Sequence, residues 1–141
     1  MIAYFDASAF LKLVIAEPGS ADARAAWDDA QTRISSRLLY PEARAGLARA
    51  RRMHRLDAPR ARAARQGIDD FLDEAELIGV TAELARRAGD LAEEHGLRAY
   101  DAVHLASAEE IGDAATVFVA ADGQLLAAAA ERGLNTLSLP H

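Results

Sequence analysis

Short apolar runs alternate along this chain with segments of helical periodicity, and this alternation constrains the fold more than any other feature. The apolar runs predict five strands, at residues 2–5, 32–35, 77–80, 116–120 and 136–139. The intervening segments predict seven helices, at residues 8–16, 21–30, 38–54, 57–74, 81–96, 99–111 and 124–132. Strands that alternate with helices pair in parallel and carry helices on both faces. The sequence therefore predicts a three-layer α/β/α domain around a central, mainly parallel sheet.

The size and composition of the chain exclude several classes of protein. Its 141 residues predict a single domain over residues 1–141. The absence of cysteine excludes disulfides, thiolate zinc sites and cysteine nucleophiles. No apolar run approaches the roughly 20 residues of a membrane helix, and no basic segment precedes the apolar N-terminus as in a signal peptide. We therefore expect a cytoplasmic protein with no membrane partner.

The charge of the chain is unevenly distributed. The net charge is −6, which by itself argues against a nucleic-acid partner. Between Arg33 and Arg65, however, ten arginines accompany only two acids, Glu42 and Asp57. Such a segment suits a phosphate backbone or an acidic partner, although it is also compatible with a solvated helical face. The sequence does not separate an RNA-binding role from a protein-binding role for this basic segment.

Four carboxylates occupy positions that predict one shared cleft. Asp6 and Asp122 follow predicted strands, and ligands of open parallel sheets bind beyond the carboxyl ends of the strands. Glu42 and Asp101 lie in apolar stretches where an acid is unexpected. Each of the four has a simpler explanation, because an aspartate after a strand commonly caps a helix and an acid near a helix N-terminus interacts with the dipole. Their common placement near one sheet edge favours convergence.

Electrostatics predicts what such a convergence requires. Two carboxylates about 5 Å apart repel each other by roughly 3 kcal/mol at an effective dielectric constant of about 20. Four carboxylates within reach therefore need either protonation or a bound cation. Oxygen ligands alone favour Mg²⁺ or Mn²⁺, and such an ion can activate water for attack on a phosphodiester. We expect Asp6, Glu42, Asp101 and Asp122 to be both metal ligands and catalytic residues.

Four segments surround the four carboxylates, namely residues 5–12 (FDASAFLK), 40–43 (YPEA), 97–106 (LRAYDAVHLA) and 117–122 (VFVAAD). In this order they resemble the four motifs of PIN-domain ribonucleases, and in particular of the VapC toxins of bacterial toxin–antitoxin pairs. The third segment is the most distinctive. The resemblance implies a PIN fold in which Asp6, Glu42, Asp101 and Asp122 form an acidic metal site, with the hydroxyl of Ser8 either orienting Asp6 or contacting metal-bound water.

The resemblance also implies a function and partners. It implies a Mg²⁺- or Mn²⁺-dependent endoribonuclease that cleaves structured RNA, often tRNA or rRNA, and leaves 5′-phosphate and 3′-hydroxyl ends. It implies a homodimer that is held inactive by a VapB-type antitoxin.

The fourth motif departs from the family at one position. Members often carry threonine or serine two residues before the aspartate of this motif, whereas this chain has Ala120. The missing hydroxyl would weaken metal affinity or shift substrate choice without removing a ligand. The alternative function is therefore a catalytically weak or inactive PIN module that binds antitoxin or RNA without cleavage. A haloacid dehalogenase-type phosphatase is disfavoured, because Ser8 stands where that chemistry needs a second aspartate.

Three further residues have mainly structural explanations. His104 follows Asp101 by three residues on the same helix face, and we expect it to be a packed, hydrogen-bonded core residue and not a ligand. Lys12 either reaches toward phosphate or extends from its helix into solvent. Trp27 is predicted to be a core or dimer-contact residue, because no aromatic cluster suggests a base-stacking surface.

Overall fold

The computed structural model describes residues 1–141 and contains the predicted alternation of strands and helices. The strands are β1 (Ile2–Phe5), β2 (Thr32–Ser36), β3 (Glu76–Ile78), β4 (Thr116–Ala120) and β5 (Asn135–Ser138). The helices are α1 (Ala7–Val14), α2 (Ser20–Asp29), α3 (Leu39–Arg52), α4 (Ala58–Leu72), α5 (Ala82–His95), α6 (Ala99–Ile111) and α7 (Gly123–Glu131). None of the helices has the length and apolar character that crossing a membrane requires.

The five strands form one sheet in the order β3-β2-β1-β4-β5. Every neighbouring pair is parallel, and Ile2 is aligned with Thr32 on one side and with Thr116 on the other. The chain winds outward from β1 to β3 and then returns to place β4 beside β1. The strand order therefore reverses between β1 and β4, which is the position where open α/β sheets bind their ligands.

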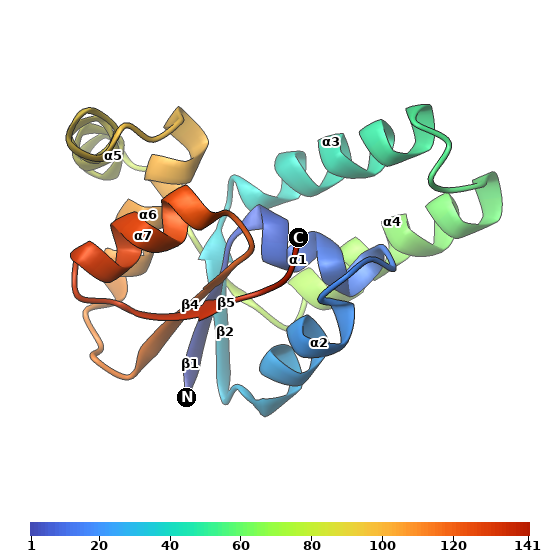
Figure 1. Ribbon diagram of the computed structural model, residues 1–141, viewed down its shortest axis with the longest axis horizontal. Helices are drawn as coiled ribbons and strands as arrows, with labels where there is room; N and C mark the ends of the chain where they lie inside the picture. Colours follow the sequence, from blue (N-terminus) through green and yellow to red (C-terminus); the bar gives the residue numbers. More distant parts are fainter.

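Helices cover both faces of the sheet and enclose two separate hydrophobic cores. Ala3 and Phe5 face the core beneath α1 to α4, whereas Tyr4 faces the core beneath α5 to α7. This alternation along β1 follows from the two-residue period of a strand. Figure 1 shows the two groups of helices on opposite sides of the strands, with the α3–α4 pair extending away from the sheet. The predicted three-layer architecture is confirmed.

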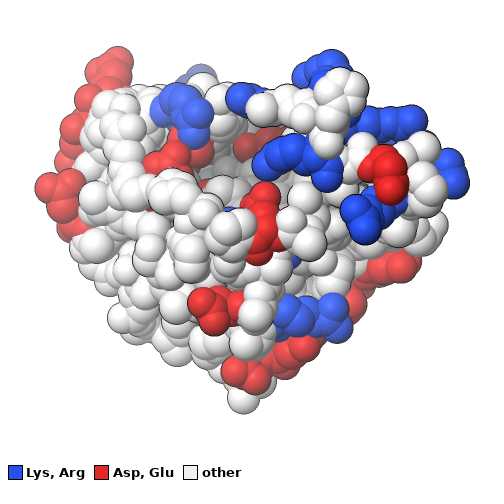
Figure 2. Space-filling model, turned by 45° about the vertical axis from the view of Figure 1, so that its right-hand side comes forward, with Lys and Arg blue, Asp and Glu red and all other residues white.

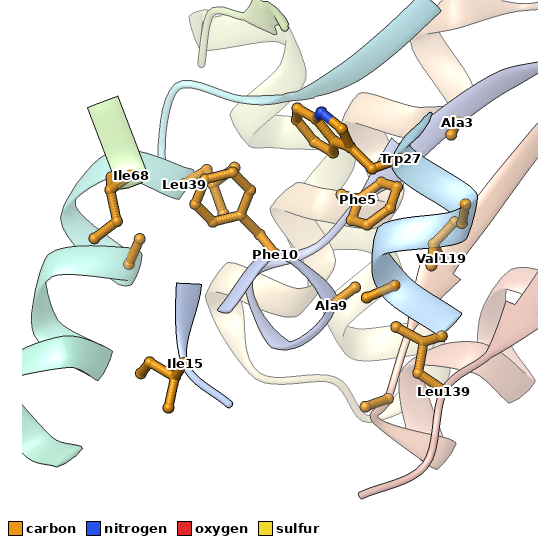
Figure 3. Close-up of a cluster of buried hydrophobic side chains, with 14 of the residues drawn as sticks. Ala3, Phe5, Ala9, Phe10, Ile15, Trp27, Leu39, Ile68, Val119 and Leu139 are labelled. Atoms are coloured by element: carbon orange, nitrogen blue, oxygen red, sulfur yellow. The ribbon is translucent and has the colours of Figure 1, made fainter. Parts of the chain in front are cut away.

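An aromatic cluster organises the core beneath α1 to α4. The Trp27 ring lies edge to face with Phe5, Phe10 and Phe71, at centroid distances of 5.1, 5.9 and 5.5 Å. Trp27 is 1% exposed, and Figure 3 shows it above Phe5 and Phe10. Such edge-to-face pairs stabilise a core beyond the burial of area alone. Of the two predicted roles, Trp27 has the core role in this chain.

Four predicted boundaries, the ends of the third strand and of the first, third and fourth helices, were wrong by about two residues. The third strand ends at Ile78 and not at residue 80, because β3 is an edge strand that pairs only with Ile34–Ser36 of β2. Beyond it the chain leaves the sheet, and Val80 is 45% exposed. The first helix ends at Val14 and not at residue 16, because Ile15 has extended backbone angles.

Close contact between α1 and α3 brings two sequence-distant segments to the same place. A Cβ atom added at Gly46 of α3 would lie 2.6 Å from Leu11 Cδ1 of α1. The absence of a side chain at this position therefore allows the two helices to approach closely. The approach places the start of α3, which carries Glu42, beside the start of α1, which follows Asp6.

We predict that Phe10→Ala lowers the free energy of unfolding by about 3–5 kcal/mol, the usual cost of truncating a buried aromatic side chain. Phe10 is fully buried against Trp27. Urea unfolding followed by the fluorescence of Trp27, the only tryptophan, measures this loss. Phe10→Leu, which retains most of the buried volume, serves as the control. Equal losses in the two variants would contradict the packing described.

Candidate active site

The four predicted site residues line one cavity at the switch point of the sheet. The cavity has a volume of about 740 Å³ and is bordered by Asp6, Glu42, Asp101 and Asp122. Asp6 follows β1, and Asp122 lies two residues beyond β4. The other two carboxylates come from the first turns of α3 and α6. The structure thus brings together all four residues that the sequence predicts to converge.

Asp6 is the most deeply buried of these carboxylates and is held by three hydrogen bonds. It caps α1 by accepting from the Ala9 N–H at 2.9 Å, and the Ser8 hydroxyl lies 2.7 and 2.9 Å from its two oxygens. Burial raises the pKa of Asp6 to about 6, although the charge of His104 and the bonds from Ala9 and Ser8 oppose this rise. Asp6 therefore lacks sufficient positive charge nearby to offset its desolvation.

Ser8 connects the two central strands at this edge of the sheet. Its hydroxyl donates to Asp6 and accepts from the Ala121 N–H at 3.0 Å. The segment after β4 is thereby held against the start of α1. The orienting role that the family resemblance implies for Ser8 agrees with these contacts.

Arg98 is a site residue that the sequence analysis missed. Its guanidinium donates to Asp101 at 3.0 Å and to Asp122 at 3.2 Å. Burial raises the pKa of Asp101, and the hydrogen bond and charge of Arg98 oppose that rise. The Arg98 side chain is 63% exposed, so it is able to rotate into solvent. The sequence could have indicated this contact, because Arg98 lies three residues before Asp101, which is about one helical turn.

His104 links the cavity to the core on the other face of the sheet. The Nε2 atom lies 2.6 Å from Glu42 Oε1, and Nδ1 lies 2.8 Å from the Tyr4 hydroxyl. An ionised Glu42 only accepts, so the Nε2–H of His104 donates to it. Burial raises the pKa of Tyr4, which keeps this phenol protonated. His104 is fully buried and hydrogen-bonded as predicted, and it additionally orients a site carboxylate.

Asp122, Asp101 and Lys12 each had a simpler explanation, helix capping for the two aspartates and extension into solvent for the lysine. Asp122 caps α7 through the Leu125 N–H at 3.1 Å, so Asp6 and Asp122 are helix caps as well as cavity residues. Asp101 does not cap α6, because Arg98 occupies the N-cap position. Lys12 is buried at the edge of the cavity and donates to Glu17 and to the Pro18 carbonyl, so its ammonium does not extend into solvent.

The chemistry of the donor set fits a hard divalent cation, but the side chains do not yet converge on one point. No three of the acidic or imidazole side chains lie close enough together to hold an ion as they stand. Ser8, His104 and Arg98 instead provide hydrogen bonds to the four carboxylates. Oxygen-only donors suit Mg²⁺ or Mn²⁺, and rotation of Arg98 would leave Asp101 and Asp122 available. Asp6, Glu42, Asp101 and Asp122 are the residues that could hold such an ion.

Comparison with known proteins relates this chain to a family. The PIN-domain family model matches residues 3–131. The chain is 45% identical over 124 residues to ribonuclease VapC45 and to ribonuclease VapC49, from two strains of Mycobacterium tuberculosis. Each match covers 88% of this chain and 86% of the relative.

Two solved structures have the same fold at low sequence identity. Mycobacterium tuberculosis VapC20, a toxin that cleaves the sarcin-ricin loop, has a TM-score of 0.69 at 22% identity, covering 89% of this chain and 94% of its own. A toxin–antitoxin complex from Klebsiella pneumoniae has a TM-score of 0.63 at 20% identity, covering 85% of this chain and 86% of its own.

We predict that Asp6→Asn changes how the stability of the metal-free protein depends on pH. The folded-state pKa of about 6 exceeds the value of about 3.9 in an unfolded chain, so the folded state binds this proton more tightly. The resulting stability is fully present below about pH 4. It is lost as the pH rises through about 6, by roughly 3 kcal/mol in total. Asparagine still caps α1 but has no charge to bury. The free energy of unfolding of Asp6→Asn should therefore rise relative to that of the wild type as the pH increases across this range.

Urea unfolding in the presence of a chelator, at several values between about pH 4 and pH 7, measures the difference between the two proteins. Asp90→Asn, which removes an exposed carboxylate from α5, is the matched control and should show no such trend. A difference between wild type and Asp6→Asn that stays constant with pH would contradict the burial of an unbalanced charge at Asp6.

Proposed function

Because this chain belongs to the PIN-domain family and is a VapC-type ribonuclease toxin, we propose that it is a Mg²⁺- or Mn²⁺-dependent endoribonuclease that cleaves structured RNA, either tRNA or rRNA. One observation carries the proposal: four carboxylates from four different elements line a single cavity at the switch point of the sheet. The fold that this chain shares with a toxin that cleaves the sarcin-ricin loop supports the substrate class.

We assign Asp6, Glu42, Asp101 and Asp122 as the metal ligands and catalytic residues. A divalent cation held by these carboxylates would lower the pKa of water for nucleophilic attack and would stabilise negative charge on the phosphate. The protein's own contribution is to fix part of this donor set in advance, which lowers the cost of organising the site. Ser8 and the Ala9 N–H fix Asp6, as described above.

His104 and Arg98 have different roles in this proposal. His104 is buried and holds Glu42 through a 2.6 Å hydrogen bond, so it is a positioning residue. Arg98 pairs with both Asp101 and Asp122 and is exposed, so it can move aside when a cation enters. The guanidinium then remains at the cavity rim, where it can bind an oxygen of the phosphate that is cleaved.

A VapB-type antitoxin is the protein partner that we propose, together with a homodimeric toxin in the cytoplasm, where tRNA and rRNA occur. The fold shared with a subunit of a toxin–antitoxin complex supports the antitoxin. The alternative of an inactive module receives no support from Ala120. Its side chain packs in the core beneath α5 to α7, and the cavity retains all four carboxylates.

We predict that purified, antitoxin-free protein cuts cellular tRNA or rRNA into discrete fragments with 5′-phosphate ends. Cleavage should require Mg²⁺ or Mn²⁺ and stop when a chelator is added. Asp101→Asn should lower the cleavage rate by at least about 100-fold, because loss of a ligand costs more than the 10–100-fold typical of its supporting residues. Gel electrophoresis of labelled RNA measures the rate.

Asp90→Asn is the control, since this exposed carboxylate on α5 lies outside the cavity. It should cleave RNA at the wild-type rate. Cleavage that survives in Asp101→Asn would show that the site is wrongly assigned. Folded, metal-supplied protein that cuts no RNA would favour the binding module.

A further inference from the structure

The basic segment divides into two surfaces on different faces of α3. Arg49 and Arg52 line a depression that continues from the acidic cavity and shares Glu42 with it. On another face, Arg44 and Arg51 line a groove against α4, where Arg62 and Arg65 complete it. The division follows from helical spacing, because residues three or four apart lie on the same face. The first surface is continuous with the site, whereas the second shares no residue with it.

The arginines beside the cavity are available to a ligand. Arg49 and Arg52 are exposed, and neither forms an ion pair, whereas Arg55 further along pairs with Glu17 at 3.9 Å. The only carboxylate that lines their depression is Glu42, which His104 already binds. Figure 2 shows most of the visible Lys and Arg atoms at the upper right of the molecule, beside a hollow that is bordered by Asp and Glu atoms. Positive charge thus adjoins an acidic centre.

We propose that Arg49 and Arg52 bind backbone phosphates a few nucleotides from the phosphate that is cleaved, on the same RNA strand. This inference rests on the proposed ribonuclease function and adds the path of the substrate. A strand whose phosphate lies among the carboxylates must continue out of the cavity, and α3 supplies the positively charged wall of that exit. Free arginines at such a wall offset phosphate charge without reading the sequence of the RNA.

The length of α3 sets how far along the RNA these contacts occur. A helix rises about 1.5 Å per residue, so Arg49 and Arg52 lie about 10 and 15 Å along the axis from Glu42. A stacked strand advances about 3.4 Å per nucleotide. The two arginines therefore contact phosphates about three and four nucleotides from the cleaved bond. Tyr100 lies across the same depression and is 44% exposed, with the Arg98 guanidinium 5.2 Å from its ring centroid, so it is suited to contact an intervening base.

A protein partner suits this depression less well than a polyanion does. Its lining consists mainly of small and charged side chains, namely Ala7, Glu42, Ala45, Gly46, Arg49 and Arg52, with Tyr100 as the one large ring. Protein interfaces depend on buried aromatic and apolar anchors at their centre. Phosphate binding depends on charge and needs no such anchors. The observations therefore favour RNA at this surface.

The test compares two double variants that remove the same charge. Arg49→Gln/Arg52→Gln alters the surface beside the cavity, and Arg62→Gln/Arg65→Gln alters exposed arginines with the same three-residue spacing on α4. Both are made in full-length Asp101→Asn protein, so that the RNA is bound but not cut. Binding of pooled cellular tRNA and rRNA fragments is measured at several salt concentrations, after thermal unfolding has shown that both variants are folded.

We predict that Arg49→Gln/Arg52→Gln weakens binding at low salt by at least about tenfold. The slope of log affinity against log salt concentration should fall by about 1.4, because each lost phosphate contact on a single strand contributes about 0.7. The Arg62→Gln/Arg65→Gln protein should keep the original slope. Equal losses in the two variants, or a loss only in the α4 variant, would overturn the inference.

Two further outcomes separate this inference from the function on which it rests. If the wild-type protein cuts RNA but Arg49→Gln/Arg52→Gln binds it with an unchanged slope, the inference fails and the nuclease stands. If that variant keeps its RNA affinity but no longer holds the co-expressed antitoxin, the surface belongs to the protein partner and the inference also fails. Wild-type protein that neither binds nor cuts RNA would remove the proposed function itself.

Discussion

The parallel pairing of β1 with β4 is the constraint on which the rest of this structure depends. It places two strands that are more than one hundred residues apart side by side, with Phe5 aligned with Val119. Because the two strands are parallel, both carboxyl ends open at the same edge, and Asp6 and Asp122 come together there. The Ser8 hydroxyl then fastens the two segments by bonding to Asp6 and to the Ala121 N–H. The acidic cavity is therefore a consequence of strand order.

Asp6 and Asp122 have a structural role and, in the proposed function, a chemical role as well. Each caps a helix with one oxygen, and each faces the cavity. A cap fixes the carboxylate at the end of a strand, where a ligand of the sheet would bind. Helix capping and site formation are therefore compatible explanations for these aspartates. Asp101 differs, because it lies inside the first turn of α6 and is held by Arg98.

The sequence predicted the three layers, every helix and strand, and the convergence of the four carboxylates on one cavity. These features depend on local periodicity and on the parallel sheet. It did not predict the contacts of Arg98 with Asp101 and Asp122, since these depend on where α6 begins relative to α7. It also could not divide the arginines into two surfaces. That division depends on which face of α3 packs against α4, and periodicity among arginines alone does not specify it. The early end of β3 likewise reflects its place at the sheet edge.

The chain of hydrogen bonds from Tyr4 through His104 to Glu42 makes the position of one cavity carboxylate sensitive to packing on the far side of the sheet. Tyr4 stacks on Phe118 at a centroid distance of 5.4 Å, within the core beneath α5 to α7. A substitution that moves this pair also moves the imidazole, and with it the oxygen that Glu42 presents to the cavity. In the proposed function, activity therefore depends on a core that contains none of the four carboxylates. Substitutions in this part of the hydrophobic interior would then change the chemistry as well as the stability.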